Sequence, residues 1–106
     1  MKTHKDLKIW KDSIELVKSV YDVVKIFPRE ELYNLGSEMK KTVISIPSNI
    51  AEGAARQSKK ELLRFLYVSL GSLSELETQC IIAKELNFLK DDKLMEDIES
   101  LRRLFY

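Results

Sequence analysis

Few residues in this chain of 106 can form tight turns or covalent cross-links, because it contains only 3 Gly, 2 Pro and 1 Cys. A β-sandwich or barrel needs a turn roughly every 8–12 residues, so the shortage of Gly and Pro argues against a strand-rich fold. A single cysteine excludes an internal disulfide. No apolar run approaches the roughly 20 residues that span a bilayer. We therefore expect a protein with little β-structure, no structural disulfide and no membrane partner.

Residues that carry enzyme chemistry are equally scarce. His4 is the only histidine and Cys80 the only cysteine, and nothing in the pattern brings them together as a nucleophile pair. One histidine does not supply the two Glu-x-x-His motifs of a di-iron bundle, and the three glycines are too far apart for a phosphate-binding loop. The spacing typical of metal ligands is absent as well. The sequence predicts no enzymatic activity, no metal and no cofactor, and we interpret Cys80 as a small core residue.

Charge is abundant but unevenly distributed. The chain has 18 Lys and Arg against 17 Asp and Glu, a net charge of +1, with 44% hydrophobic residues. This composition is typical of a globular domain, and the near-neutral total argues against a protein that coats nucleic acid with its whole surface. Residues 40–64, however, carry six positive and two negative side chains, whereas residues 65–101 carry three positive and eight negative. The first residues include lysines without a following apolar run, so we expect no secretory signal and a cytoplasmic location.

Apolar residues recur at helical spacing in four segments, and the first two meet at a proline. The first segment covers residues 9–27. The second follows it, with Pro28 as its first helical residue. Within the second segment Pro47 removes a backbone donor, so the helix either bends there or ends and restarts. We expect a kinked second helix, in which Ser48 and Asn49 supply donors to the freed carbonyls.

The third and fourth segments have clearer starts. The third begins at the Ser-Lys-Lys-Glu sequence 58–61, a capping box whose serine caps the helix and whose glutamate reaches back. Its apolar positions follow steps of three and four as far as Cys80. The fourth is capped by Asp91 or Asp92 and runs straight into the C-terminus. We predict an all-α, antiparallel, up-and-down four-helix bundle that forms one domain over residues 1–106.

Six basic side chains in and between the second and third helices form the candidate nucleic-acid-binding site. They gather in one patch if these two helices are adjacent. Such a patch neutralises phosphates and releases counterions, which gives binding a strong salt dependence. The alternative interpretation is a solvated face that Glu52 and Glu61 partly neutralise. The six residues are Lys40, Lys41, Arg56, Lys59, Lys60 and Arg64.

The helices also carry more apolar rows than the core of one bundle absorbs, notably at 14–27 and 62–70. A domain this small buries a limited fraction of its surface, so we expect a homo-oligomer. The acidic stretch 91–99 is either a solvated face or a docking site for the basic region of a neighbouring subunit.

Several sequence elements together resemble one known family. The long segment at 45–53 is the most specific, and the resemblance covers residues 7–105. The elements are LKIWK at 7–11, FP at 27–28, LG at 35–36, SIPSNIAEG at 45–53, Arg56, SKKE at 58–61, RFL at 64–66 and GSLSELETQ at 71–79. They resemble the four-helix-bundle proteins first noticed as open reading frames inside intervening sequences of bacterial 23S rRNA genes.

This resemblance implies a homopentamer without enzymatic activity. A relative, the accessory protein of diversity-generating retroelements, forms a barrel-like pentamer that associates with nucleic acid and a reverse transcriptase. Where many members have two arginines, this chain has Lys40 and Lys41, which keep the charge without the bidentate geometry of arginine. We therefore expect a homopentameric accessory protein that binds RNA or DNA through the six basic residues. The alternative is a protein-interaction scaffold with a protein partner and no role in nucleic-acid binding.

Overall fold

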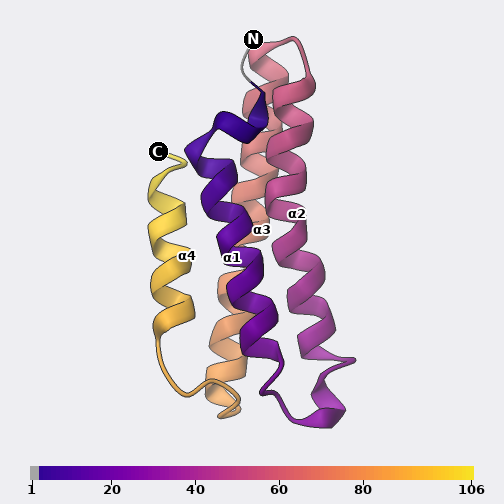
Figure 1. Ribbon diagram of the computed structural model, residues 1–106, viewed down its shortest axis with the longest axis vertical. Coiled ribbons are helices and arrows are strands. Elements are labelled where there is room, and N and C mark those ends of the chain that lie inside the picture. Colours follow the sequence, from indigo (N-terminus) through magenta and orange to yellow (C-terminus); the bar gives the residue numbers. More distant parts are fainter. Residues whose placement is uncertain (1–2) are drawn as a thin grey trace.

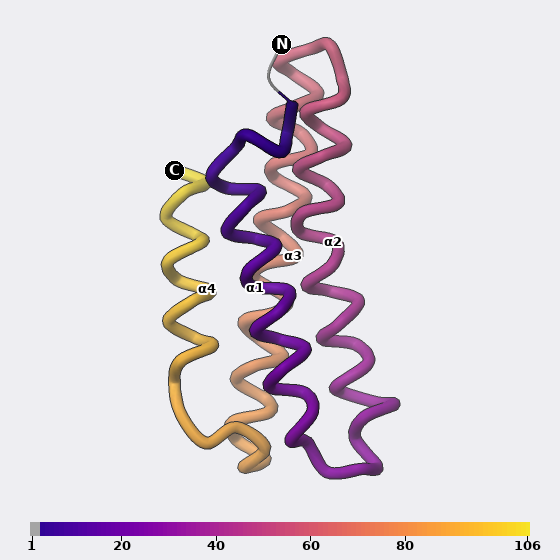
Figure 2. Tube along the Cα trace, in the orientation of Figure 1, coloured from indigo at the N-terminus to yellow at the C-terminus, as the bar shows by residue number. Residues whose placement is uncertain are grey.

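The computed structural model describes residues 3–106, and within them it contains helices and no strand. The α-helices are α1 (Lys8–Val24), α2 (Leu35–Ala55), α3 (Lys59–Glu85) and α4 (Lys93–Arg103), and two short 3-10 helices are η1 (His4–Asp6) and η2 (Arg29–Glu31). In Figure 1 the chain runs down α1, up α2, down α3 and up α4. Figure 2 shows that each connection joins neighbouring ends of successive helices. The predicted all-α, four-helix fold is confirmed.

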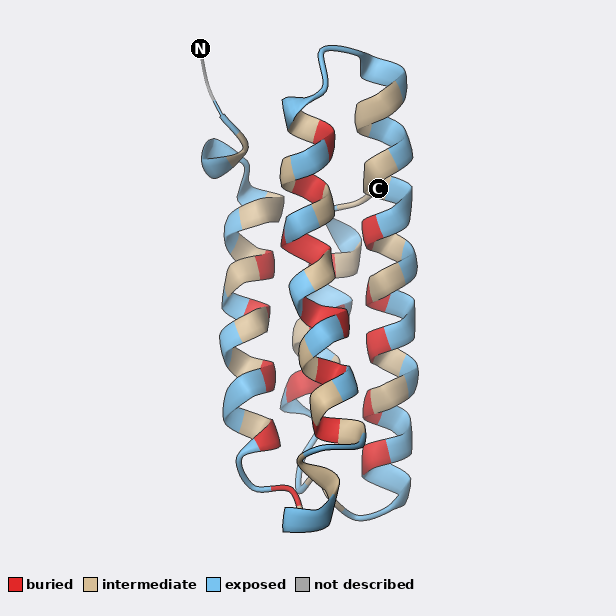
Figure 3. Cartoon of the chain, turned by 90° about the vertical axis from the view of Figure 1, so that its right-hand side faces the viewer, coloured by how far each residue is buried: buried red, intermediate tan, exposed pale blue. Residues whose placement is uncertain are grey.

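Each α-helix contributes one apolar face to a single buried core (Figure 3). On α1 this face follows Leu16, Val20 and Val24 at helical spacing. Cys80 is fully buried in the core, as predicted. Burial of each large apolar side chain contributes about 1.5–3 kcal/mol. The other helices contribute Met39, Val43, Ile46, Ile50, Leu73, Leu76, Ala83, Leu94, Ile98 and Leu101.

The connection between α1 and α2 differs from the prediction. α1 ends at Val24, three residues before Phe27, because a residue that precedes proline disfavours helical backbone. Pro28 does not begin α2: its backbone is extended, with ψ 144°, and it leads into η2 instead. α2 begins at Leu35. At the next residue, Gly36, the two helices are so close that a Cβ would lie 2.7 Å from Val24 Cγ1.

α2 is one continuous helix through Pro47, which is buried. Ser48 Oγ donates to the carbonyl of Ile44 at 2.8 Å, and Asn49 Nδ2 donates to the carbonyl of Ser45 at 2.8 Å. The predicted side-chain donors bond to carbonyls in the turn before the proline, but these are not the Val43 carbonyl, which is the one that Pro47 frees. The alternative in which the helix ends and restarts at Pro47 is wrong, whereas the kink stays a prediction.

The start of α3 contains half of the predicted capping box. Ser58 Oγ accepts a hydrogen bond from the Glu61 amide at 3.2 Å. The Glu61 carboxylate does not complete the box, because it pairs with Arg64 Nε at 3.3 Å instead. Where α3 passes α2, a Cβ on Gly53 would lie 2.7 Å from Phe65 Cβ, so the glycine allows the two helices to touch.

Polar contacts fix how α2 and α3 pair along their length. They occur at three heights between the two helices, and all of them lie on faces that are at least partly buried. The contacts are Ser45 Oγ to Ser72 Oγ at 2.8 Å, Ser69 Oγ to the Ile46 carbonyl at 2.9 Å, and Gln79 Nε2 to Thr42 Oγ1 at 3.0 Å.

The connection from α3 to α4 turns at Asn87, which has a left-handed backbone with φ 63°. The Phe88 amide donates to the Ala83 carbonyl at 2.8 Å, as expected for a helix that ends in a left-handed residue. Asp91 Oδ1 accepts from the Lys93 amide at 3.1 Å at the start of α4. Asp91 is thus the predicted acidic residue that satisfies a free amide there.

α4 covers only part of α3. It has 11 residues against 27 in α3, so it spans about 16 Å against about 40 Å. Arg102 Nη1 and Nη2 donate to the two carboxylate oxygens of Glu77 on α3, at 3.1 and 3.0 Å. α4 ends at Arg103 and does not run to the C-terminus as predicted. The Leu104 and Phe105 amides donate to carbonyls three residues earlier, and Phe105 and Tyr106 line a groove on α3. The N-terminal part of α3 therefore extends past α4 (Figure 1).

Candidate nucleic-acid interface

The connection between α2 and α3 gathers four of the six predicted basic residues. Arg56 directly follows α2, Lys59 and Lys60 are the first residues of α3, and Arg64 lies about one turn further along. All four are exposed. We call these four residues the basic turn. Figures 1 and 2 show that this end of the α2–α3 pair projects beyond both α1 and α4.

The two arginines of the basic turn stack on one aromatic ring. The guanidinium carbon of Arg64 lies 4.5 Å from the centre of the Phe65 ring, and that of Arg56 lies 5.2 Å from it. Stacking and cation–π attraction hold both guanidinium groups in a defined orientation. The arginines are therefore pre-oriented before any ligand arrives.

Acidic neighbours neutralise part of the basic turn. Arg56 Nη2 lies 3.1 Å from Glu52 Oε2, and Arg64 pairs with Glu61 as described above. These are the two glutamates that the solvated-face interpretation named. Within residues 3–106, Lys59 and Lys60 make no ion pair. The unneutralised charge of the basic turn therefore comes mainly from these two lysines.

The remaining two predicted site residues lie elsewhere. Lys40 and Lys41 precede Arg56 by 16 and 15 residues on α2, a distance of about 22–24 Å along the helix. Lys40 Nζ lies 4.8 Å from the centre of the Tyr21 ring on α1. The part of α3 next to these lysines is near Gln79, which donates to Thr42 Oγ1 on α2, and the basic turn lies elsewhere along α3. α2 and α3 are neighbours as expected, but the six residues form two groups and not one patch.

An aromatic groove beside the basic turn was not predicted. It has a volume of about 100 Å³ and lies between α3 and the last two residues of the chain. Tyr67 is 73% exposed and Tyr106 is 87% exposed. The signal for it was the surplus of apolar residues at 62–70 together with the aromatic C-terminal pair. The aromatic groove consists of Leu63, Leu66, Tyr67, Leu70, Phe105 and Tyr106.

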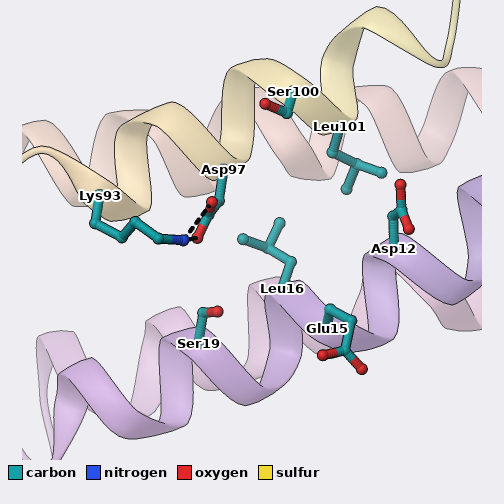
Figure 4. A pocket seen from close by; sticks show the side chains of 8 residues that line it. All are labelled: Asp12, Glu15, Leu16, Ser19, Lys93, Asp97, Ser100 and Leu101. Carbon is teal, nitrogen blue, oxygen red and sulfur yellow. Dashed lines mark hydrogen bonds and ion pairs between the residues drawn. The ribbon is translucent and has the colours of Figure 1, made fainter.

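A second, polar groove of about 280 Å³ separates α1 from α4 (Figure 4). Its carboxylates do not converge: Lys93 Nζ donates to both oxygens of Asp97 at 2.7 Å, while Asp12 and Glu15 pair with lysines of their own helix. The hydrogen bond that Lys93 donates to Asp97 raises the pKa of Lys93. No group of three His, Cys, Asp or Glu side chains in residues 3–106 is placed to hold a metal ion. The groove lacks the converging carboxylates that acid–base chemistry would use.

The sole cysteine and the sole histidine lie far apart. Burial, and secondarily the charge of Glu77, raise the pKa of the Cys80 thiol to about 12, so it stays protonated at neutral pH. His4 stacks edge-on against Trp10, with ring centres 5.1 Å apart, near the end of the bundle that carries the basic turn. Cys80 lies about 30 Å from that end, measured along α3.

The fold and these surfaces define a small four-helix bundle with a projecting basic end. In the part of the chain that the structure describes, no helix combines the length and the apolar character needed to cross a membrane. The family model of the 23S rRNA-intervening sequence protein matches residues 5–106. The chain belongs to this family, and the resemblance seen in the sequence is confirmed. No curated protein matches the chain.

Proposed function

We propose that this chain is a non-enzymatic, homo-oligomeric accessory protein that binds RNA or DNA through the basic turn. One observation carries the proposal: two unpaired lysines and two pre-oriented arginines lie together on the end that projects from the bundle. Lysine is a mobile point charge for a phosphate, while the arginine fork bonds phosphate oxygens in pairs. A polyanion therefore finds both kinds of contact on one exposed surface.

Assembly strengthens this mode of binding. We infer a homopentamer, which repeats the basic turn five times and adds the counterions released at each copy. Self-association is supported by apolar side chains that one copy leaves exposed, such as Val68 at 43% and Ile82 at 44% on α3. These two residues are 14 positions apart, nearly four helical turns, so they share one face.

A non-enzymatic role is supported by the chemistry of the two candidate reactive sites. The Cys80 thiol is buried and has a pKa of about 12, so it lacks the thiolate that a nucleophile requires. In the groove between α1 and α4, Asp97 is engaged by Lys93 on both oxygens. We place the protein in the cytoplasm, where a single unpaired cysteine is stable.

The test is nucleic-acid binding by charge-reversed variants. Lys59, Lys60 and Arg64 are changed together to Glu, and affinity for a short labelled RNA is measured at several salt concentrations. Each lost phosphate contact removes about 0.7–0.9 from the slope of log affinity against log salt. We expect weaker binding and a shallower slope.

Two variants reverse charge outside the basic turn. Lys40→Glu with Lys41→Glu tests the separate lysine pair on α2. Lys11→Glu with Lys18→Glu and Lys25→Glu reverses three exposed lysines in and directly after α1, which is the same change in net charge as in the basic-turn variant. Both should retain most of the affinity. Wild-type protein that binds no RNA or DNA at low salt, or a basic-turn variant that binds as well as wild type, overturns the proposal.

The second candidate function is a protein-interaction scaffold. It is favoured by the aromatic groove, since exposed apolar patches frequently mark protein contacts, and by the glutamates that neutralise both arginines of the basic turn. Capture of one partner protein that survives nuclease treatment and is lost on Leu63→Glu would favour this function over nucleic-acid binding.

A further inference from the structure

We propose that the aromatic groove takes unpaired bases of a single-stranded nucleic acid whose phosphates contact the basic turn. This inference rests on the proposed function and adds the form of nucleic acid that fits the site. It comes from a juxtaposition on α3, where cationic and aromatic side chains follow one another along the same face.

The spacing of residues along α3 places two cationic side chains and an aromatic ring on the same face of the helix. Lys60, Arg64 and Tyr67 are separated by four and three residues, the spacing of side chains that share a helix face. Lys60 and Tyr67 are about 10 Å apart along the helix axis. A rise of about 3.4 Å per nucleotide belongs to one strand of a stacked duplex, and an extended single strand advances further per nucleotide, so this distance corresponds to at most about three nucleotides. A strand whose phosphates follow the cations therefore brings a base to Tyr67.

The rings are exposed because α4 ends early. Arg102 joins Glu77 near the end of α4, and beyond that point the chain that follows α4 lines the groove on α3 with Phe105 and Tyr106. Tyr67 is left 73% exposed and Leu63 50% exposed. An aromatic ring beside a cationic surface is the arrangement on which proteins stack unpaired bases without reading their sequence.

The groove favours a single strand over a duplex because only unpaired bases are free to enter it. A volume of about 100 Å³ accommodates one flat group between α3 and the chain end. The bases of a duplex are paired and stacked inside the helix, so a duplex meets the basic turn through its phosphates alone.

The experiment compares a single strand with its own duplex. Affinities are measured for wild type, Tyr67→Ala and Tyr67→Phe, and the molar mass of each is measured by light scattering. Tyr67→Ala should bind the single strand about tenfold more weakly, since that is the scale of one lost base stack. Its affinity for the duplex should change less than twofold, and Tyr67→Phe should retain the wild-type affinity. Tyr33→Ala, which alters a tyrosine that is 87% exposed in the α1–α2 connection, is the matched control and should change neither.

Three results overturn the inference about the groove while the proposed function stands. The first is loss of binding on charge reversal of the basic turn with no loss for Tyr67→Ala. The second is an equal loss for single strand and duplex. A changed molar mass for Tyr67→Ala also overturns it, because the groove would then be a contact between copies. Tyr106→Ala alters only the last residue, outside every helix, and should lower single-strand affinity in the same direction. Absence of any nucleic-acid binding by wild type overturns both proposals.

Discussion

At the scale of single residues, Gly53 and Gly71 differ in the free space around them. A Cβ on Gly53 would lie 2.7 Å from Phe65 Cβ and 3.3 Å from the Leu62 carbonyl oxygen. Gly53→Ala therefore forces α2 away from α3, and we expect the free energy of unfolding to fall by about 1–3 kcal/mol. Urea denaturation at a fixed protein concentration measures the change, because unfolding of an oligomer depends on concentration.

Gly71 provides the matched control, since a Cβ there would meet no atom within 4 Å. Gly71→Ala gains helix propensity and should raise the free energy of unfolding by up to about 1 kcal/mol. Equal effects of the two substitutions would contradict the close contact at Gly53.

The buried thiol of Cys80 makes stability depend on alkaline pH. Its pKa is about 12 in the folded protein against a reference value of 9.0. Between these values the unfolded chain loses the proton first, so the free energy of unfolding falls as the pH rises. This one group contributes a slope of up to about 1.4 kcal/mol per pH unit. The contribution is absent below pH 9, where both states keep the proton.

The measurement compares wild type with Cys80→Ala from pH 8 to above pH 10. The variant is less stable throughout, because it leaves a cavity, but its decline above the reference pKa of 9.0 should be shallower. Two parallel curves would show that the thiol titrates alike in both states.

At the scale of elements, the ion pair between Arg102 and Glu77 joins the C-terminal part of α4 to α3, in addition to the apolar contacts that Leu94, Ile98 and Leu101 make with the core. Arg102 bonds both oxygens of Glu77, and the two side chains are 18% and 30% exposed. The pKa of Arg102 is raised, chiefly by the hydrogen bonds that it donates to Glu77. Glu77→Ala should lower the free energy of unfolding by about 1–2 kcal/mol, an amount that allows for partial solvent screening.

Hydrogen exchange tests where this loss occurs. Amides of α4 should exchange faster in Glu77→Ala, and amides of α2 should not. Glu75→Ala is the control, since Glu75 is exposed and makes no ion pair within residues 3–106. Uniformly faster exchange would contradict a local role of the pair.

The helices themselves were predictable because apolar periodicity records which face is buried. Their ends were less so: the expected start of α2 at Pro28 overlooked that proline also suits an extended connection. The capping box at 58–61 was predicted only in part: the Glu61 side chain does not bond back to the helix start, because it pairs with Arg64. The end of α4 depends on where Phe105 and Tyr106 find apolar surface, which a local pattern does not contain.

At the scale of the whole molecule, we expect the exposed apolar side chains that the core does not bury to hold copies of the chain together. We expect light scattering to give five times the chain mass of 12.4 kDa at micromolar concentration. Val68→Glu combined with Ile82→Glu puts charges on the exposed face of α3 and should lower that mass. Tyr33→Glu, in the exposed α1–α2 connection, should leave it unchanged. A wild-type monomer would contradict the proposed assembly.

The candidate site was only partly predictable. Sequence proximity identified the basic turn, because Arg56, Lys59, Lys60 and Arg64 lie within nine residues. Sequence proximity did not place Lys40 and Lys41. Because α2 and α3 run in opposite directions, residues near the start of α2 lie far along the bundle axis from residues near the start of α3. The aromatic groove depends on the different lengths of α3 and α4, which become apparent only when the helices are packed.

The polar contacts between α2 and α3 have a consequence for how the chain avoids misfolding. Sliding α3 by one turn, about 5.4 Å, would still pair apolar side chains of α3 with apolar side chains of α2. It would, however, remove Ser69 Oγ from the Ile46 carbonyl and Gln79 from Thr42. Each stranded buried polar group costs about 1–3 kcal/mol. The slipped pairing is therefore several kcal/mol less stable than the native one, and the basic turn keeps a single, defined shape.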